Sequence, residues 1–292
     1  MNAERLKYVT AVVLYGTIGV CLRYVSLPSE IAALCRGVIG SLFLLAFSAL
    51  RKQMPQRDAI RANWFWLILS GVCLGLNWIF LFAAYTHTTV AIASLCNYMA
   101  PLIVILVAPL LLREPMEKKK LPCVAAALVG ILLVSGVFGG EKGEPVGVAF
   151  GLAAAAGFVC IVLCNCKLRG ITATDRAIVQ LAVSAVTILP YAIVKNRGAA
   201  LTVDARSVLV ILLLGVVHTG VAYRLYFSGM AKLPVQTVAV LGYLEPVVSV
   251  LCSALLLHEP MSAAGWVGAV LIIAAAVTSE LIPSERKEAA LP

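Results

Sequence analysis

Residues 91–116 read AIASLCNYMAPLIVILVAPLLLREPM, and residues 236–261 repeat this stretch as QTVAVLGYLEPVVSVLCSALLLHEPM. The offset between the two copies is 259 − 114 = 145 residues, about half of the 292-residue chain. Nine of the 26 aligned positions are identical without a gap, and each copy is a long apolar segment with a proline inside it. An internal repeat of this length indicates that the chain is built from two similar halves.

The composition is typical of a membrane protein. Hydrophobic residues make up 62% of the chain and charged residues 13%, and the mean hydropathy is +0.99. A soluble domain carries about 25% charged residues, which cover its surface. The net charge of +9 does not form one basic patch, because Lys and Arg lie between apolar runs. We therefore expect the protein to lie in a lipid bilayer and not to bind a nucleic acid.

The apolar runs predict ten membrane-spanning helices. A helix needs about 20 residues to cross ~30 Å of hydrocarbon. Suitable runs cover residues 8–26, 31–50, 64–84, 90–112, 121–138, 146–166, 176–194, 207–229, 235–257 and 263–282. The predicted fold class is an all-α membrane protein. We interpret the first run as an uncleaved span, since no small-residue cleavage site follows it.

Basic residues in the short loops predict the orientation. Lys and Arg are far more frequent on the N-terminal side of the membrane than on the opposite side, and Lys118, Lys119 and Lys120 form one cluster there. Because cytoplasmic loops carry the excess of Lys and Arg, both termini are predicted to be cytoplasmic. The protein is then expected to be a multi-pass protein of the cell inner (plasma) membrane.

Five spans in each half make the second half an inverted copy of the first. The first repeat is predicted to cover residues 1–142 and the second residues 143–285, followed by a polar tail over residues 286–292. An odd number of spans starts the second copy on the opposite side of the membrane. Inverted repeats are a common basis of alternating access in secondary transporters, with the substrate site near the midplane.

Prolines interrupt the fourth and ninth predicted spans at matching positions. Pro246 has no N–H to donate and clashes with the carbonyl group of Gly242. Pro101 is expected to act in the same way on Asn97. Two interrupted segments at corresponding positions of two halves point to a transport site.

The sequence also predicts side-chain directions in the ninth span and a structural role for the glutamates that end the two spans. Tyr243 and Glu245 are about 200° apart on an ideal helix, so they should face different ways. Glu114 and Glu259 each end a span just before a proline. We interpret these two glutamates as structural groups, whose carboxylates cap nearby N–H groups while the proline stops the helix.

Glu245, near the middle of the ninth span, is the leading candidate for chemistry, because a charge inside the membrane is costly. Its counterpart in the first half is Ala100, so the repeat does not require the acid. Glu245 could bind a proton or a cation, or it could be a structural group that pairs with Arg224 or caps backbone freed by Pro246. Arg36, in the second span, is expected to snorkel towards the headgroups or to hold a loop.

Polar and aromatic residues near the proline breaks form the predicted substrate site. A small organic solute needs an apolar wall with a few placed polar groups. Trp78 and Tyr98 could supply this wall and a cation–π contact with an amine, although packing or interfacial positions would also explain them. His218 could titrate, or it could be a hydrogen-bonded packing residue. The predicted substrate-binding set is Asn77, Trp78, Asn97, Tyr98, His218, Tyr223, Tyr243 and Glu245.

The chain resembles the EamA family of the drug/metabolite transporter superfamily over essentially its whole length. The resemblance rests on the ten-span plan, the five-plus-five repeat, the Tyr-x-x-Pro of the fourth and ninth spans, and the Glu-Pro that ends each of them. It implies a transporter fold and the export or exchange of small metabolites such as amino acids.

We therefore predict a secondary transporter that exports a small polar, amino-acid-like metabolite by alternating access. The alternatives are an uncoupled facilitator, an exporter of drugs or other metabolites, and an intramembrane lipid-handling enzyme. The sequence contains no Walker loop, metal-ligand cluster or nucleophile–base arrangement, so we expect no enzymatic activity, cofactor or metal. Proton coupling is left open, as is the choice between a monomer and a homodimer.

Overall fold

The computed structural model describes residues 3–100, 102–104, 106–107, 118–134, 145–197, 203–230, 233 and 241–282. Every regular element in these ranges is a helix, and none is a strand. The predicted all-α fold class is therefore confirmed for the part of the chain that is described. Pro101, Glu114 and residues 286–292, on which predictions were made, lie outside it.

The first half of the chain forms α1 (Ala3–Gly16), α2 (Ile18–Arg23), α3 (Ser29–Leu50), α4 (Arg57–Ala62), α5 (Trp64–His87), α6 (Val90–Asn97), the short 3-10 helix η1 (Lys118–Lys120) and α8 (Leu121–Val134). The second half forms α9 (Pro145–Asn165), α10 (Ala173–Lys195), α11 (Ala205–Leu213), the π-helical segment η2 (Leu214–Val221), α12 (Ala222–Met230), α14 (Leu244–Leu256) and α15 (Ala263–Leu281).

Six helical segments within the described ranges are long and apolar enough to cross a membrane. They cover Ala3–Arg23, Ser29–Leu50, Trp64–His87, Pro145–Asn165, Ala173–Lys195 and Ala205–Tyr226. The apolar helices α14 and Ala263–Ser279 are shorter. The predicted spans 90–112 and 121–138 continue into residues that are not described. The structure thus supports six of the ten predicted spans at full length.

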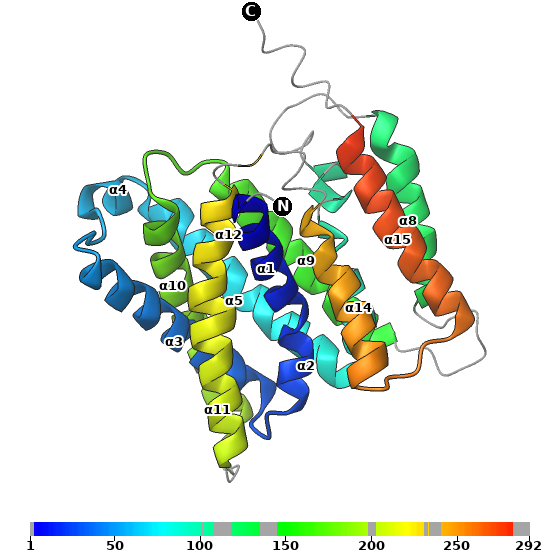
Figure 1. The fold of residues 1–292 in the computed structure, drawn as a ribbon, viewed down its shortest axis with the longest axis horizontal. Coiled ribbons are helices and arrows are strands. Elements are labelled where there is room, and N and C mark those ends of the chain that lie inside the picture. The colour runs from blue at the N-terminus through cyan, green and yellow to red at the C-terminus, as the bar shows by residue number, and fades with distance from the viewer. Residues whose placement is uncertain are drawn as a thin grey trace, which may run out of the picture.

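The two halves of the chain are interleaved in space (Figure 1). α5 packs against α9 and α10, and α3 packs against α10. On the other side of the bundle α1 lies along α12, and α8 pairs with α15. Each of these contacts joins a helix of the first half to a helix of the second. A cavity inside the bundle is therefore walled by both halves at once.

The two interrupted spans meet each other inside the bundle. α6 ends at Asn97, and Tyr98 is its C-terminal cap. α14 begins at Leu244, after Tyr243, so that proline 246 falls in its first turn, where a missing N–H is tolerated. The hydroxyl of Ser249 in α14 donates to the hydroxyl oxygen of Ser94 in α6 over 2.7 Å. The helix interruption predicted in the ninth span is therefore present. In the fourth span, α6 ends at Asn97, the residue at which the sequence predicted the break.

Glycines allow the closest helix approaches. A Cβ added to Gly268 of α15 would lie 2.5 Å from the carbonyl oxygen of Gly130 in α8. A Cβ added to Gly16 of α1 would lie 2.7 Å from the carbonyl oxygen of Glu245 in α14. The backbones at both crossings are in contact, as small residues permit in membrane helices. The second crossing fixes α14 at the position of its acidic residue.

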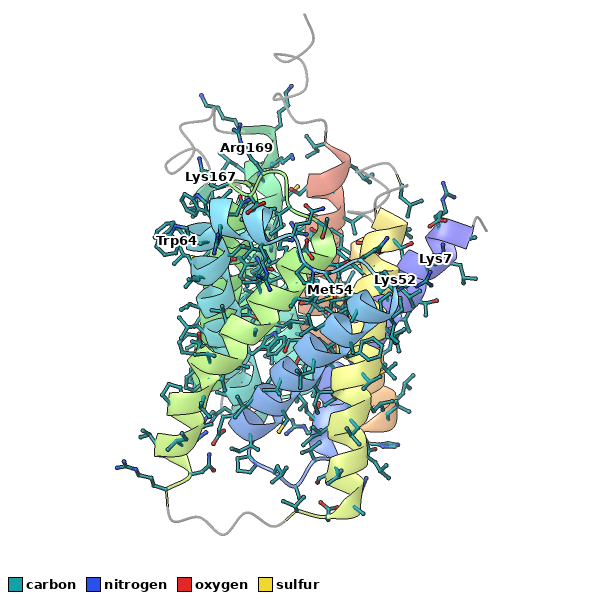
Figure 2. All side chains as sticks on the ribbon, turned by 90° about the vertical axis from the view of Figure 1, so that its left-hand side faces the viewer. Lys7, Lys52, Met54, Trp64, Lys167 and Arg169 are labelled. Carbon is teal, nitrogen blue, oxygen red and sulfur yellow. The ribbon has the colours of Figure 1, made fainter. Side chains whose placement is uncertain are left out.

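Basic residues of several loops and helix ends gather at one end of the bundle. Lys7, Lys52, Lys167 and Arg169 all lie towards the upper end in Figure 2, together with Trp64. Lys7, Lys52 and Lys167 are separated from one another by long helices in the sequence. The predicted topology assigns these basic residues to one side of the membrane, and they do share one end of the bundle.

The Gly130–Gly268 crossing gives a prediction for stability. Replacing Gly268 by Leu (Gly268→Leu) should lower the thermal unfolding temperature of the purified protein in detergent, because overpacking of this kind costs about 1–3 kcal/mol. The neighbouring substitution Val267→Leu is a matched control, since Val267 is 59% exposed. Equal unfolding temperatures of the two variants would contradict the close packing of α8 on α15.

Candidate functional site

A cavity of about 370 Å³ lies among helices of both halves. Its polar and charged lining consists of Arg36, Asn77, Asn97, Asn165, Arg176, Gln180 and Glu245. Its aromatic lining includes Tyr15, Trp78, Tyr85, Tyr223 and Tyr226. Pockets for small molecules combine apolar and aromatic walls with a few polar groups that fix the orientation of the ligand. The central cavity has this composition.

Five predicted site residues line the central cavity: Asn77, Trp78, Asn97, Tyr223 and Glu245. They come from α5, α6, α12 and α14, so the interleaved fold brings together residues that are far apart in the sequence. The remaining predicted residues, Tyr98, Tyr243 and His218, are placed behind this lining or away from it.

Tyr98 and Tyr243 have different positions relative to Glu245. The hydroxyl of Tyr98 hydrogen-bonds the carboxylate of Glu245 and so orients it. Tyr243 is buried in an apolar cluster with residues of α6, α8 and α15. Glu245 instead faces the cavity. Tyr243 and Glu245 therefore point in different directions, as their spacing predicts.

His218 is a buried residue of η2 that does not line the central cavity. Its Nε2 atom lies 3.0 Å from the hydroxyl oxygen of Thr17, and its Nδ1 atom lies 3.4 Å from the carbonyl oxygen of Leu213. The contact with Thr17 ties η2 to the start of α2. Both contacts fit the hydrogen-bonded packing role that the sequence left open for His218.

Amide side chains connect the helices around the cavity. The Nδ2 group of Asn77 donates to the Oδ1 atom of Asn97 over 3.1 Å and to the carbonyl oxygen of Ala154 over 2.7 Å. The Nε2 group of Gln180 donates to the Oδ1 atom of Asn165 over 2.7 Å. α5, α6, α9 and α10 are thereby linked by hydrogen bonds at the cavity wall.

The expectation that Arg36 snorkels towards the headgroups is wrong. Arg36 is only 6% exposed and lines the central cavity. Its Nε group donates to the hydroxyl oxygen of Thr219 over 2.9 Å, and its guanidinium carbon lies 4.4 Å from the centre of the Trp78 ring. Arg36 belongs to the face of α3 that packs into the bundle, so its side chain turns inward. One face of Trp78 is therefore occupied by an arginine of the protein itself.

The suggested pairing of Arg224 with Glu245 is also wrong. The guanidinium carbon of Arg224 lies 4.1 Å from the centre of the Phe47 ring, and Arg224 lines a different pocket, of about 250 Å³. Arg224 follows Tyr223 directly, and adjacent helical residues are about 100° apart, so the two face different ways. The described residues contain no ion pair that involves Glu245. The arginine that interacts with Glu245 electrostatically is Arg36.

Several lining residues were not selected from the sequence. Gln180 could have been found, because it is a polar residue within an apolar run, the feature that drew attention to Glu245. Tyr15, Tyr85 and Tyr226 carry no such signal, since tyrosines occur throughout the membrane segments. Their place in the cavity depends on helix packing.

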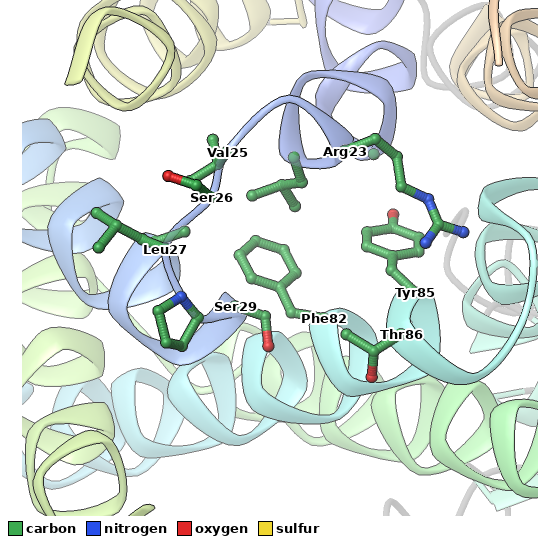
Figure 3. Close-up of a pocket in the computed structure, with 12 residues that line it drawn as sticks. Arg23, Val25, Ser26, Leu27, Ser29, Phe82, Tyr85 and Thr86 are labelled. Atoms are coloured by element: carbon green, nitrogen blue, oxygen red, sulfur yellow. The ribbon is translucent and has the colours of Figure 1, made fainter. Parts of the chain in front are cut away.

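A second pocket, of about 370 Å³, lies at the end of α2 (Figure 3). It is lined by the turn between α2 and α3 and by Phe82, Tyr85 and Thr86 of α5. Tyr85 lines both this pocket and the central cavity. It therefore stands between the two spaces.

Beside this pocket lies a set of hydrogen-bonded residues that we name the Glu259 cluster: Arg23, Thr88, Val90, Ser253 and Glu259. An Nη2 atom of Arg23 lies 2.5 Å from the Oε1 atom of Glu259 and donates to the carbonyl oxygen of Thr88 over 3.0 Å. The Oε2 atom of Glu259 accepts from the backbone N–H of Val90 over 2.8 Å and from the hydroxyl of Ser253 over 2.6 Å. The predicted capping role of Glu259 is confirmed, and the helix that it caps is α6.

The site geometry defines a class of protein. A polar cavity walled by apolar helices of two interleaved halves is the arrangement expected of a membrane transporter. The family model of the EamA-like transporter family matches residues 6–136 and, a second time, residues 142–279. The chain belongs to the EamA-like transporter family. It is therefore a multi-pass membrane protein of a transporter family.

Individual relatives are similar at low identity. Protein PecM of Dickeya dadantii is 28% identical over 258 residues, which are 86% of this chain and 84% of PecM. The uncharacterized transporter YxxF of Bacillus subtilis is 23% identical over 84% of this chain and 79% of its own length. A probable amino-acid metabolite efflux pump of Escherichia coli is 28% identical over 66% of this chain and 69% of its own length.

The fold has a counterpart among solved structures. One crystal structure superposes with a TM-score of 0.66 over 96% of this chain and 98% of the other chain, at 21% sequence identity. This likeness supports the helical arrangement described above.

The hydrogen bonds of Asn77 give a prediction for stability. Asn77→Leu should lower the free energy of unfolding by about 1–3 kcal/mol, because it leaves the buried carbonyl oxygen of Ala154, and the Oδ1 atom of Asn97, without their donor. The measurement is thermal unfolding in detergent, compared with Leu76→Met, a conservative change at the exposed neighbouring position. If Asn77→Leu unfolds at the wild-type temperature, the amide link between α5 and α6 does not stabilise the cavity wall.

Proposed function

We propose that this protein is a secondary transporter that exports a small polar, amino-acid-like metabolite across the cell inner membrane. The observation that carries the proposal is the central cavity, in which Arg36 and Glu245 face one space between the halves of the chain. Charged groups inside a membrane protein are costly and are kept at substrate and ion pathways. The name of the E. coli relative, a probable amino-acid metabolite efflux pump, supports the choice of solute.

The proposed architecture is two inverted repeats of five helices, covering residues 1–142 and 143–285, with a polar tail over residues 286–292. The two matches of the family model, at 6–136 and 142–279, support this division. We propose that both termini are cytoplasmic, and the shared position of the basic residues labelled in Figure 2 at one end of the bundle supports this orientation.

The transport mechanism proposed is alternating access. The central cavity extends to Asn165 at the end of α9 and to Arg176 near the start of α10. These helix ends flank Lys167 and Arg169 at the basic end of the bundle, which is the proposed cytoplasmic end (Figure 2). At the opposite end the Glu259 cluster joins α2 and α6 of the first half to α14 and the turn after it. Release of solute to the outside then requires the Arg23–Glu259 ion pair to open.

Reconstituted protein gives the direct test. Proteoliposomes that contain the purified chain should take up or exchange a solute from a broad metabolite panel, in the presence of a pH gradient of either sign. Protein-free liposomes are the control. Failure to move any solute of the panel under both gradients would overturn the proposed function.

Glu245→Gln separates coupled transport from facilitated transport. If Glu245 carries the coupling proton, exchange by the variant at a saturating solute concentration should no longer depend on the pH gradient, because Gln cannot release a proton. The measurement is uptake with and without the gradient in wild type and variant. Unchanged transport would instead favour an uncoupled facilitator of the same fold.

The Glu259 cluster gives a second kinetic prediction. Arg23→Gln and Glu259→Gln should each change the exchange rate in the same direction, and the double variant should change it little further, because either substitution removes the same ion pair. Coupling between contacting residues is on the order of 1 kcal/mol. Lys7→Gln, which removes the surface pair of Lys7 with Glu4, is the control. Additive effects of the two substitutions would show that the pair does not act as a unit.

A further inference from the structure

Arg36 has unused hydrogen-bonding capacity inside the central cavity. An arginine side chain carries five N–H donors. The described residues contain one hydrogen bond of the Arg36 side chain, from Nε to Thr219, and no ion pair of Arg36. At 6% exposure the group is removed from bulk solvent, yet it lines a cavity of about 370 Å³. A buried arginine that no direct ion pair neutralises is costly inside a membrane protein, and an anionic ligand would offset this cost.

The surroundings of Arg36 hold the guanidinium in a fixed orientation. The ring of Trp78 covers one face at 4.4 Å, and the hydroxyl of Thr219 accepts from Nε. Thr219 is itself held, because its hydroxyl donates to the carbonyl oxygen of Leu214 over 2.9 Å. With the face and the Nε edge occupied, the two Nη groups remain for a ligand. Their planar fork matches the two oxygens of a carboxylate.

Glu245 supplies the opposite charge in the same cavity. Arg36 and Glu245 interact electrostatically, and within the described residues they form no direct ion pair. The hydroxyl of Tyr98 orients the Glu245 carboxylate. A solute with a carboxylate and an ammonium group a short distance apart would satisfy both side chains at once. Apolar lining from Leu74, Leu81 and Ile161 would then meet the rest of the solute.

We propose that Arg36 binds the carboxylate of a zwitterionic α-amino acid through its two Nη groups, and that Glu245 binds the ammonium group of the same molecule. This inference rests on the proposed transport function and specifies its substrate class. It assigns Trp78 to the support of Arg36, in place of the contact with a substrate amine that the sequence suggested. Arg36 is then the residue that excludes amines and neutral solutes.

Ligand discrimination by the full-length wild-type protein tests the inference without any substitution. Thermal shift in detergent is measured with the standard L-amino acids and with their carboxamides, which keep the ammonium group and lose the carboxylate. At least one amino acid should raise the unfolding temperature, and its carboxamide should bind about tenfold or more weakly, because a hydrogen-bonded charge pair is lost. Equal binding of acid and carboxamide, or no binding of any amino acid, would overturn the inference.

Variants then locate the carboxylate contact. Arg36→Lys keeps the charge and loses the fork, so it should weaken amino-acid binding about tenfold and leave carboxamide binding unchanged. Arg224→Gln is the matched control, since Arg224 also stacks on an aromatic ring but lines another pocket. It should bind amino acids like the wild type. A loss of acid and carboxamide binding by the same factor in Arg36→Lys would show that Arg36 only supports the fold.

Transport distinguishes this inference from the proposed function. Proteoliposomes that move amines or sugars but no amino acid would overturn the carboxylate site and leave the transporter in place. Proteoliposomes that move no solute at all would overturn both.

Discussion

Backbone polar groups inside a membrane must find hydrogen-bond partners within the protein, and the rest of the structure depends on this constraint. Unbroken helices meet it by themselves. The two interrupted segments, at the end of α6 and the start of α14, can exist only where they are covered by other helices. The structure places them against each other, and their serines Ser94 and Ser249 are hydrogen-bonded across the contact. The breaks that weaken two helices therefore also determine where the interior of the protein is polar.

Interleaving of the two halves explains how this polar interior is built. Each wall of the central cavity contains helices from both halves, and its amides link one helix to the next. Arg36 from the first half and Glu245 from the second then share one space without a direct ion pair in the described residues. Two halves that can move relative to each other would change the shape of this space. The Glu259 cluster joins the two halves at the end of the molecule opposite to Lys167 and Arg169.

The sequence was sufficient for those features that depend on one helix at a time. The all-α fold, the break before Pro246 and the opposite directions of Tyr243 and Glu245 follow from apolar length, proline chemistry and helical period. Features that depend on the rotation of one helix against another were not accessible. Arg36 and Arg224 both looked like isolated charges in apolar runs, and only packing decides that the first faces the cavity and the second faces Phe47. Arg23 and Glu259 are 236 residues apart, so no local pattern could pair them.

The π-helical segment η2 determines where the helix formed by α11, η2 and α12 can lose a residue without changing the cavity. A π-helical turn bonds each residue to the fifth one along instead of the fourth, which accommodates an additional residue within a continuous helix. The side chain of Thr219 follows the same spacing, since its hydroxyl donates to the carbonyl oxygen of Leu214. The phase of α12 relative to α11 is thereby set at η2, and with it the inward direction of Tyr223 and Tyr226. A single-residue deletion in this segment would turn η2 into ordinary α-helix and leave this wall of the cavity in place, whereas the same deletion in α11 or α12 would rotate part of the wall towards the lipid.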